Sequence, residues 1–179
     1  MKRHVALAGF MASGKSTIGR KLARRLRWPF CDTDSLVIRA HGPIAKIFAD
    51  EGEGTFREYE RTALATALER TQSAVIALGG GALTVAANRA LLRRNAYCVF
   101  IEVSPEQIFA RVRRSRGVRP LLGADPTLAR IKELYAERMH YYRSADCVID
   151  ARRRSDAQVI GEIVEWLRLR KVDAAGLVS

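Results

Sequence analysis

The sequence predicts an α/β fold in which a parallel sheet carries helices on both faces. Five short runs are apolar along their whole length, and longer segments with helical spacing separate them. A strand without a polar face is buried on both sides, and a helix between two strands allows their parallel connection. With 179 residues the chain has the length of one domain, which we expect to span residues 1–179.

The first half of the chain predicts three strands and three helices. The first helix carries Ile18, Leu22 and Leu26 four residues apart on one face, and Pro29 ends it. Two more helices are expected further on, broken where glycine and glutamate alternate at 51–54. In order, the expected elements are a strand at 4–8, a helix at 16–27, a strand at 30–33, two helices between 42 and 70, and a strand at 74–78.

The second half of the chain predicts two strands and helices with clear N-terminal signals. Ser104 is the expected N-cap of one helix with Pro105 at its first position, and Ser155 with Gln158 forms a capping box for the last helix. The expected elements are a helix at 85–94, a strand at 97–103, a helix from 105, a helix at 127–142, a strand at 147–150 and a helix after 155. Since ligands of such sheets bind beyond the carboxyl ends of the strands, we expect the functional residues in the loops that follow them.

The chain carries a strong positive charge, with 31 Lys and Arg against 19 Asp and Glu and a formal net charge of +12 at pH 7. Such a charge is typical of proteins with an anionic partner: a nucleic acid, an acidic membrane or a phosphorylated small molecule. An arginine-rich surface without any such partner is the alternative interpretation. No apolar stretch reaches the roughly 18 residues of a membrane span, so we expect a cytoplasmic protein with no membrane partner.

The three cysteines, Cys31, Cys98 and Cys147, predict buried free thiols. Their number is odd, no two are close in sequence, and each lies in or beside an apolar run. A disulfide framework or a zinc site is therefore not expected, and the thiols fit a reducing cytoplasm.

The loop after the first strand has the phosphate-binding pattern G-x-x-x-x-G-K-S, directly before a helix. Its glycines let successive N–H groups surround a phosphate, and the helix N-terminus adds positive potential. Lys15 is expected to reach the β- and γ-phosphates of a nucleotide, and the Ser16 hydroxyl to bind Mg²⁺. The phosphate-binding residues predicted here are Gly9, Ala12, Ser13, Gly14, Lys15, Ser16 and Thr17.

Two carboxylates follow the second strand, at Asp32 and Asp34. On an extended segment, residues two apart point to the same side. Beside a phosphate-binding loop, Asp32 would complete the shell of a metal ion, and Asp34 would accept the proton of an attacking hydroxyl. The alternative is that one of them caps the following helix.

The order of these and later motifs resembles the shikimate kinases, small members of the nucleoside-monophosphate-kinase-like group of P-loop proteins. The resemblance runs from the phosphate loop to about residue 150. The motifs that carry it are G-x-x-x-x-G-K-S at 9–16, Asp-Thr-Asp at 32–34, Ile-Phe…Gly-Glu…Phe-Arg-x-x-Glu at 47–60, Gly-Gly-Gly at 79–81, Arg-Pro-Leu-Leu at 119–122 and Arg-x-x-x-Tyr at 138–142.

The resemblance implies a P-loop three-layer sandwich with strand order 2-3-1-4-5, an acceptor-binding region at about 33–61 and a mobile lid at about 112–124. It implies phosphoryl transfer from ATP, with Mg²⁺, to the 3-hydroxyl of shikimate, a step toward chorismate and the aromatic amino acids. Lys15, Asp34 and Arg119 are then the expected catalytic residues, and Ser16 and Asp32 the metal ligands. The acceptor-binding residues that it implies are Asp34, Phe48, Phe56, Arg57, Glu60, Gly79, Gly80, Gly81 and Arg138.

The residue types suit this acceptor, which is a small ring with one carboxylate and three hydroxyls. Arg57 and Arg138 resemble the family's carboxylate clamp, since guanidinium groups pair bidentately with carboxylates. Taken alone, each arginine would be a solvated surface charge, and three glycines after a strand would be a turn. Their coincidence in the family's order favours the functional interpretation.

The run from 111 to 122 holds five arginines within nine residues. Such a run is usually a solvated basic face, and the nucleic-acid alternative lacks interleaved aromatic residues. The resemblance makes it a lid in which Arg119 reaches the transferred phosphoryl group. Arg114 and Arg153 are then expected beside the adenine, although Ser155 and Asp156 stand where the family often has a proline nearby.

Two other functions are compatible with a phosphate-binding loop. A related kinase, such as a gluconate kinase, shares the loop and the sheet, but the Asp-Thr-Asp and Phe-Arg-x-x-Glu motifs argue against it. A nucleic-acid-binding P-loop protein would explain the charge. We expect ATP and shikimate as partners, no nucleic acid, and a monomer.

Overall fold

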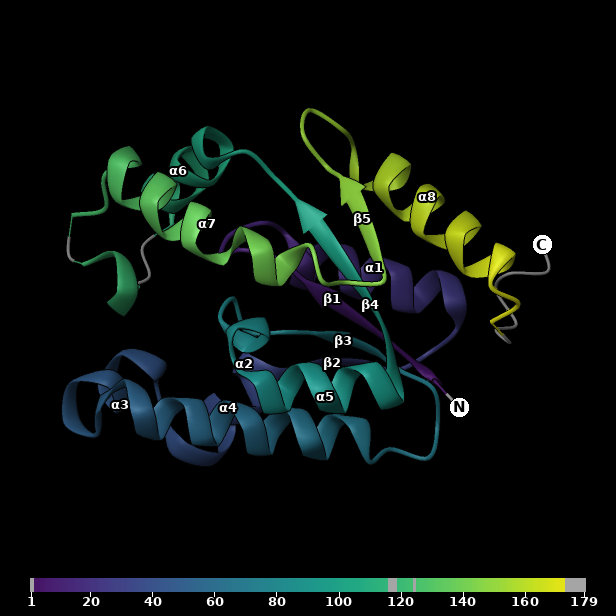
Figure 1. Ribbon diagram of the computed structural model, residues 1–179, viewed down its shortest axis with the longest axis horizontal. Coiled ribbons are helices and arrows are strands. Elements are labelled where there is room, and N and C mark those ends of the chain that lie inside the picture. The colour runs from purple at the N-terminus through teal and green to yellow at the C-terminus, as the bar shows by residue number, and fades with distance from the viewer. Residues whose placement is uncertain (1, 116–118, 124, 173–179) are drawn as a thin grey trace.

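The computed structural model describes residues 2–115, 119–123 and 125–172. Its centre is a five-stranded parallel sheet in the order β2-β3-β1-β4-β5 (Figure 1), which confirms the predicted sheet and its strand order. The strands are β1 (His4–Ala8), β2 (Phe30–Asp32), β3 (Val75–Ala77), β4 (Ala96–Glu102) and β5 (Cys147–Asp150).

Eight α-helices and two short 3₁₀ helices surround this sheet in the described part of the chain. The α-helices are α1 (Lys15–Leu26), α2 (Thr33–His41), α3 (Ile44–Asp50), α4 (Gly52–Leu68), α5 (Ala86–Asn95), α6 (Pro105–Arg114), α7 (Leu128–Tyr142) and α8 (Asp156–Leu169). The 3₁₀ helices are η1 (Ala82–Thr84) and η2 (Pro120–Leu122).

The helices form a layer on each face of the sheet. On one face α1 contacts β1, β2 and β3, and α8 packs against α1 and β5. On the other face α5 contacts β4 and lies beside α4, and α7 passes across the strands (Figure 1). Strands β1, β3 and the middle of β4 are buried along their length, as expected for strands covered on both sides.

The helix starts follow the predicted capping chemistry. The Ser104 hydroxyl accepts the Gln107 amide, and Ser155 accepts the Gln158 amide, so both α6 and α8 begin with a complete capping box. Thr127 caps α7 by accepting the amide of Arg130. These caps satisfy amides that have no partner within the helix.

One predicted boundary is wrong, and the correction moves a candidate catalytic residue. The strand expected at 30–33 ends at Asp32, and the helix α2, whose bounds were not among the expected elements, begins at Thr33. The Asp32 carboxylate accepts the Ser35 amide at 3.2 Å and so caps α2. Asp34 therefore lies in the first turn of a helix, and the expectation that both carboxylates share one extended segment is wrong.

The two helices expected between 42 and 70 are α3 and α4, with a narrower break than predicted. Only Glu51 separates them, and Gly54 lies inside α4. Helix α4 packs against both α2 and α3, and these three helices share a small apolar cluster of Val37, Ile47, Phe56 and Ala63. This cluster holds the helices at the carboxyl end of β2.

The main core contains two of the three free cysteines, Cys31 and Cys98. Burial raises the pKa of Cys98 to about 12 and that of the partly buried Cys147 to about 11, so both stay protonated thiols at neutral pH. No helix among the described residues is both long and apolar enough to span a membrane.

Candidate active site

The loop between β1 and α1 has the backbone shape that its glycines predict. Gly14 adopts a left-handed conformation with φ of +99°, directly before the first turn of α1. A Cβ on Gly9 would lie 2.8 Å from the Ser13 hydroxyl oxygen and 2.9 Å from the Ile101 carbonyl oxygen. Ala12 also has a positive φ, of +59°. The loop is therefore tightly curled and begins a helix, which is the geometry of an anion-binding N-terminus.

Lys15 is buried under this loop and bonds to its backbone. Its ammonium donates to the carbonyl oxygens of Gly9 and Phe10, at 2.8 and 2.9 Å. Burial lowers the pKa of Lys15 to about 8, although the nearby carboxylates of Asp34 and Asp32 oppose this shift. A phosphate in the loop would offer the ammonium a charged partner in place of two neutral carbonyls.

Ser16 and Asp32, the two predicted metal ligands, meet beside the loop. The Ser16 hydroxyl donates to the Asp32 carboxylate at 2.6 Å, and the other oxygen of Asp32 caps α2. Asp32 can therefore cap α2 with one carboxylate oxygen while the other oxygen faces Ser16 beside the phosphate loop, so the two predicted roles do not exclude each other. The described residues contain no cluster of three or more His, Cys, Asp or Glu side chains that would hold a metal alone.

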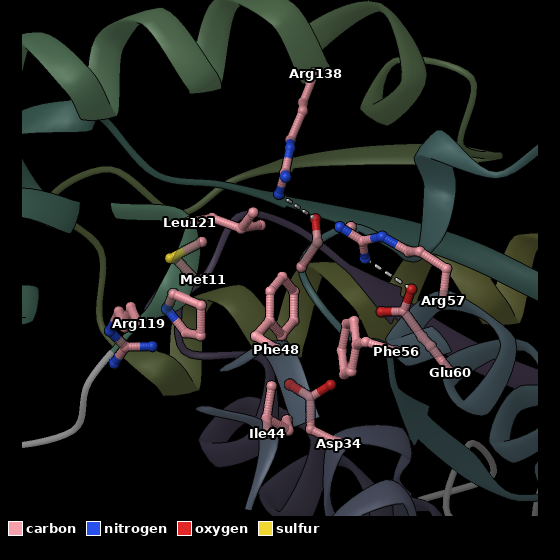
Figure 2. A pocket seen from close by; sticks show the side chains of 13 residues that line it. Met11, Asp34, Ile44, Phe48, Phe56, Arg57, Glu60, Arg119, Leu121 and Arg138 are labelled. Carbon is pink, nitrogen blue, oxygen red and sulfur yellow. Dashed lines mark hydrogen bonds and ion pairs between the residues drawn. The ribbon is translucent and has the colours of Figure 1, made fainter. Parts of the chain in front are cut away.

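A cavity of about 150 Å³ opens next to the phosphate loop (Figure 2). Helices α2, α3, α4 and α7, the loop after β3 and η2 all contribute to its wall. The residues that line it are Met11, Asp34, Ile44, Phe48, Phe56, Arg57, Glu60, Gly80, Gly81, Arg119, Pro120, Leu121 and Arg138. Every predicted acceptor-binding residue except Gly79 lies in this wall.

Arg57 is held at the cavity by two carboxylates of its own helix. Its guanidinium donates to Glu60 at 2.9 Å and to Glu53 at 2.7 Å. Glu60 is only 1% exposed, and its second oxygen has no hydrogen-bond partner. Burial raises the pKa of Glu60, whereas the neighbouring Arg57 lowers it. The ion pair fixes the direction in which Arg57 faces the cavity (Figure 2).

The glycine loop after β3 has no room for side chains. A Cβ on Gly79 would lie 2.2 Å from the Glu60 carboxylate and 2.7 Å from that of Asp34. A Cβ on Gly81 would lie 2.3 Å from the Arg57 guanidinium. The Gly79 amide donates to the Thr33 hydroxyl at 2.9 Å, which ties the loop to the start of α2. Gly79 therefore supports the site from behind the cavity wall.

Asp34 points into the cavity from the first turn of α2 (Figure 2). Burial raises its pKa, and the positive charges of Lys15, Arg57 and Arg119 lower it. Arg119 faces the same cavity, and its Nε is buried without a hydrogen-bond partner. A carboxylate between three cations can accept a hydrogen bond from a substrate hydroxyl while its charge stays balanced.

Aromatic and apolar side chains form the remaining wall. The rings of Phe48 and Phe56 are 4.8 Å apart and tilted, and both face the cavity (Figure 2). Four lining residues, Met11, Ile44, Pro120 and Leu121, were not predicted from the sequence. Met11 occupies a variable position of the phosphate-loop motif, and Pro120 and Leu121 belong to the Arg-Pro-Leu-Leu motif. Their proximity in sequence to predicted site residues could have indicated all three. Ile44 had no such signal.

A second cavity, of about 210 Å³, lies on the other side of the phosphate loop near α8. Its lining includes Ser13, Gly14 and Thr17 from the predicted loop, and also Arg111 and Arg154. The Arg111 guanidinium donates to the carbonyl oxygens of Ala12 and Ser13, at 3.1 and 2.9 Å. Neither arginine was predicted from the sequence as a site residue.

The predicted adenine contacts Arg114 and Arg153 do not line this second cavity. Arg114 is the exposed last residue of α6, and Arg153 is exposed with a φ of +55°. The predicted lid at 112–124 is described only in part, because residues 116–118 and 124 lie outside the described residues. Within the described part, Arg119 and Gly123 form a short antiparallel bridge around η2.

A parallel sheet of this order, with a phosphate-binding loop after its central strand and a cavity carrying a carboxylate and arginines beside it, defines a P-loop kinase of small molecules. The family model for shikimate kinase matches residues 11–168. The chain belongs to the shikimate kinase family.

Individual relatives support the same assignment over nearly the whole chain. A shikimate kinase from Moorella thermoacetica is 44% identical over 170 residues, covering 94% of this chain and 96% of the relative. One from Geobacter metallireducens is 38% identical over 169 residues, covering 94% and 93%. The solved structure of a shikimate kinase from Acinetobacter baumannii in complex with shikimate has a TM-score of 0.89 and 31% identity, covering 97% of both chains.

Proposed function

We propose that this kinase transfers the γ-phosphoryl group of ATP to the 3-hydroxyl of shikimate and forms shikimate 3-phosphate. The observation that carries the proposal is the cavity beside the phosphate loop, where Asp34, Arg57 and Arg138 face one small volume. That volume suits a single-ring acceptor better than a polymer. The carboxylate and hydroxyls of shikimate would find guanidinium groups, a carboxylate and backbone amides there.

In this proposal Arg57 and Arg138 bind the carboxylate of shikimate. They come from α4 and α7, which lie on different sides of the cavity, so they approach one carboxylate from two directions (Figure 2). Guanidinium groups offer paired donors with a fixed geometry, which orients the ring as well as holding it. Phe48 and Phe56 pack against the ring, and Glu60 keeps Arg57 in place.

Asp34 accepts the hydrogen bond of the reacting hydroxyl and takes its proton as the phosphoryl group is transferred. Because the transition state of such transfers is loose, positioning matters more than the strength of the base. Lys15, at the start of α1, and Arg119, directly before η2, stabilise the negative charge on the transferred group. The Arg119 side chain already faces the Asp34 cavity, which supports this role.

Ser16 and Asp32 supply two oxygen ligands beside the phosphate loop, which fits Mg²⁺ because this ion prefers oxygen ligands and keeps several waters. When bound, the ion would neutralise charge on the β- and γ-phosphates. The absence of a larger acidic cluster among the described residues agrees with an ion held mainly by nucleotide and water. The nucleotide base would lie toward the second cavity, near Arg111 and Arg154, whereas the exposed Arg114 and Arg153 lie outside the lining of that cavity.

We further propose a single domain that acts as a cytoplasmic monomer without a nucleic-acid partner, with an acceptor region at about 33–61 and a lid at about 112–124. The test of the whole proposal is a coupled assay of ADP release with a panel of hydroxy acids, including shikimate and gluconate. Turnover that depends on shikimate and yields shikimate 3-phosphate is expected. Turnover of gluconate in place of shikimate would overturn the proposal.

A further inference from the structure

Tyr142 makes a contact with the glycine loop that none of the roles above uses. It is the last residue of α7 and only 1% exposed. Its hydroxyl donates to the Gly80 carbonyl oxygen at 2.6 Å, and its ring stacks on Phe100 of β4, with centroids 4.9 Å apart and an interplanar angle of 13°. The stacked ring leaves the hydroxyl little freedom to turn away from this carbonyl. Burial also raises the pKa of Tyr142 to about 12, although a direct hydrogen bond between its side chain and that of Arg138 opposes this shift, so the hydroxyl keeps its proton.

The same carbonyl oxygen also accepts a hydrogen bond from Arg138. That bond is long, at 3.4 Å, whereas the Tyr142 bond is short. Arg138 is one of the two arginines proposed to bind the acceptor carboxylate, and it points at the glycine loop in Figure 2. If Arg138 turns to a carboxylate, the partly buried Gly80 carbonyl loses this donor, and such a carbonyl costs free energy unless another donor holds it.

The carbonyl also sets the direction of the next amide. In a trans peptide the carbonyl oxygen of Gly80 and the N–H of Gly81 point to opposite sides, and the chain has no cis peptide bond among its described residues. Since the Gly80 carbonyl points to α7, the Gly81 amide is turned away from α7. Gly81 lines the cavity, and within the described residues its amide has no hydrogen-bond acceptor.

We propose that Tyr142 is a positioning residue for acceptor binding, an inference that rests on the function proposed above. Its hydroxyl holds the Gly80 carbonyl, so that Arg138 is free to move to the acceptor carboxylate and the Gly81 amide stays available to an acceptor hydroxyl. Without this hydroxyl, Arg138 is the only remaining side-chain donor to the carbonyl among the described residues, and the acceptor carboxylate must compete with the carbonyl for it.

The test is Tyr142→Phe, which keeps the ring and its stacking on Phe100. We expect the KM for shikimate to rise about tenfold, the effect of one lost hydrogen bond, with the KM for ATP unchanged. The matched control is Tyr135→Phe, on the same helix and 9% exposed, because the Tyr135 hydroxyl has no hydrogen bond among the described residues. The control should keep both KM values. An equal rise in both KM values of Tyr142→Phe, or no change in either, would overturn the inference.

A double-mutant cycle with Arg138→Gln separates positioning from general support of the fold. If Tyr142 acts by releasing Arg138, Tyr142→Phe should have a much smaller effect on the KM for shikimate in the Arg138→Gln background. The same loss in both backgrounds would mean a structural role only and would overturn the inference. If the wild-type enzyme fails to phosphorylate shikimate at all, the proposed function fails instead, so the two failures are distinguishable.

Discussion

Lys15 is the residue whose charge depends most directly on what occupies the phosphate loop. Without a phosphate, its ammonium is buried against two carbonyl oxygens and its pKa falls to about 8. A lysine with a lowered pKa binds fewer protons than a free one at pH values above 8. Bound phosphates stabilise the charged form and raise the pKa again. Nucleotide binding should therefore be coupled to the protonation of Lys15.

We predict that ATP binding takes up protons at pH 8.5 and weakens as the pH rises further, because the free enzyme then holds Lys15 partly neutral. The phosphates of ATP titrate near pH 6 to 7 and contribute little at this pH. Titration calorimetry in two buffers with different protonation enthalpies measures the uptake. Lys15→Met should bind ATP weakly and take up no proton. Equal heats in both buffers with the wild-type protein would contradict the prediction.

Asp34→Asn removes the proton acceptor while keeping the shape of the side chain. We predict that kcat falls by about 10²- to 10⁴-fold, the usual contribution of a positioned base. ATP affinity should change little, since Asp34 faces the acceptor cavity. Steady-state kinetics and nucleotide titration check the two halves separately. Near-normal turnover of this variant would remove Asp34 from the mechanism.

At the scale of elements, the glycine loop after β3 matters because three other elements contact it. The Thr33 hydroxyl of α2 accepts the Gly79 amide, and Tyr142 of α7 donates to the Gly80 carbonyl. The Arg57 guanidinium of α4 occupies the space that a Cβ on Gly81 would need. We predict that Gly81→Ala raises the KM for shikimate at least tenfold. The new Cβ would lie only 2.3 Å from the Arg57 guanidinium, so Arg57 would have to move away from its place at the cavity.

The control for this prediction is Gly54→Ala, in the same helix as Arg57. A Cβ at Gly54 meets nothing within 4 Å, and the helical backbone accepts alanine. It should keep the kinetics and stabilise the fold by about 0.5–1 kcal/mol, because alanine favours helices over glycine. Thermal unfolding and steady-state kinetics distinguish the two variants. Unchanged acceptor affinity in Gly81→Ala would show that the loop can yield.

Elements were predictable from the sequence where a local signal fixed them. Apolar runs predicted all five strands, and the Ser104 and Ser155 motifs predicted the starts of α6 and α8. Helix α2 was missed for two reasons. The strand Phe30 to Asp32 is too short for an apolar pattern to show where it ends, and the residues of α2 do not form one continuous apolar face. The packing of α2 on α4, a tertiary contact, decides its conformation.

The candidate site was predictable to a similar degree, for the same reason. Residues inside motifs, such as Arg57 and Arg138, reached the cavity as expected, since motif order carries the topology. Arg111 was missed because its contact with the loop carbonyls joins residues about 100 positions apart. Nothing in the arginine run distinguishes Arg111 from Arg113 or Arg114 without the geometry of α6.

For the whole molecule, the charge of +12 is unevenly distributed. Residues 1–27 hold eight Lys and Arg and no acid, whereas residues 32–69 hold eight acids and four Lys and Arg. The three arginines that line the cavity are Arg57, Arg119 and Arg138. Many of the other arginines, such as Arg24 and Arg25, are exposed. Long-range attraction of anionic substrates is the effect that such a surface can have.

We predict that replacing Arg24 and Arg25 with Gln leaves kcat within about twofold, since screening limits exposed charges to a range of about 8–10 Å at physiological salt. The variant should have a lower kcat/KM than the wild-type protein at 50 mM salt, because it attracts anionic substrates less strongly. This difference should disappear at 200 mM salt. Steady-state kinetics at the two salt concentrations measures it, with the wild-type protein as reference. A tenfold loss of kcat/KM that persists at 200 mM salt would mean that these arginines contact a substrate.

The position of β1 determines when the enzyme can fold during synthesis. It is the first strand of the chain and the middle strand of the sheet, where Val5 pairs with Val75 on one side and with Tyr97 on the other. The ribosome therefore releases β1 and its phosphate loop long before their neighbours exist, and such non-local pairing is slow. The nucleotide site is encoded first and completed only after more than half of the chain has emerged.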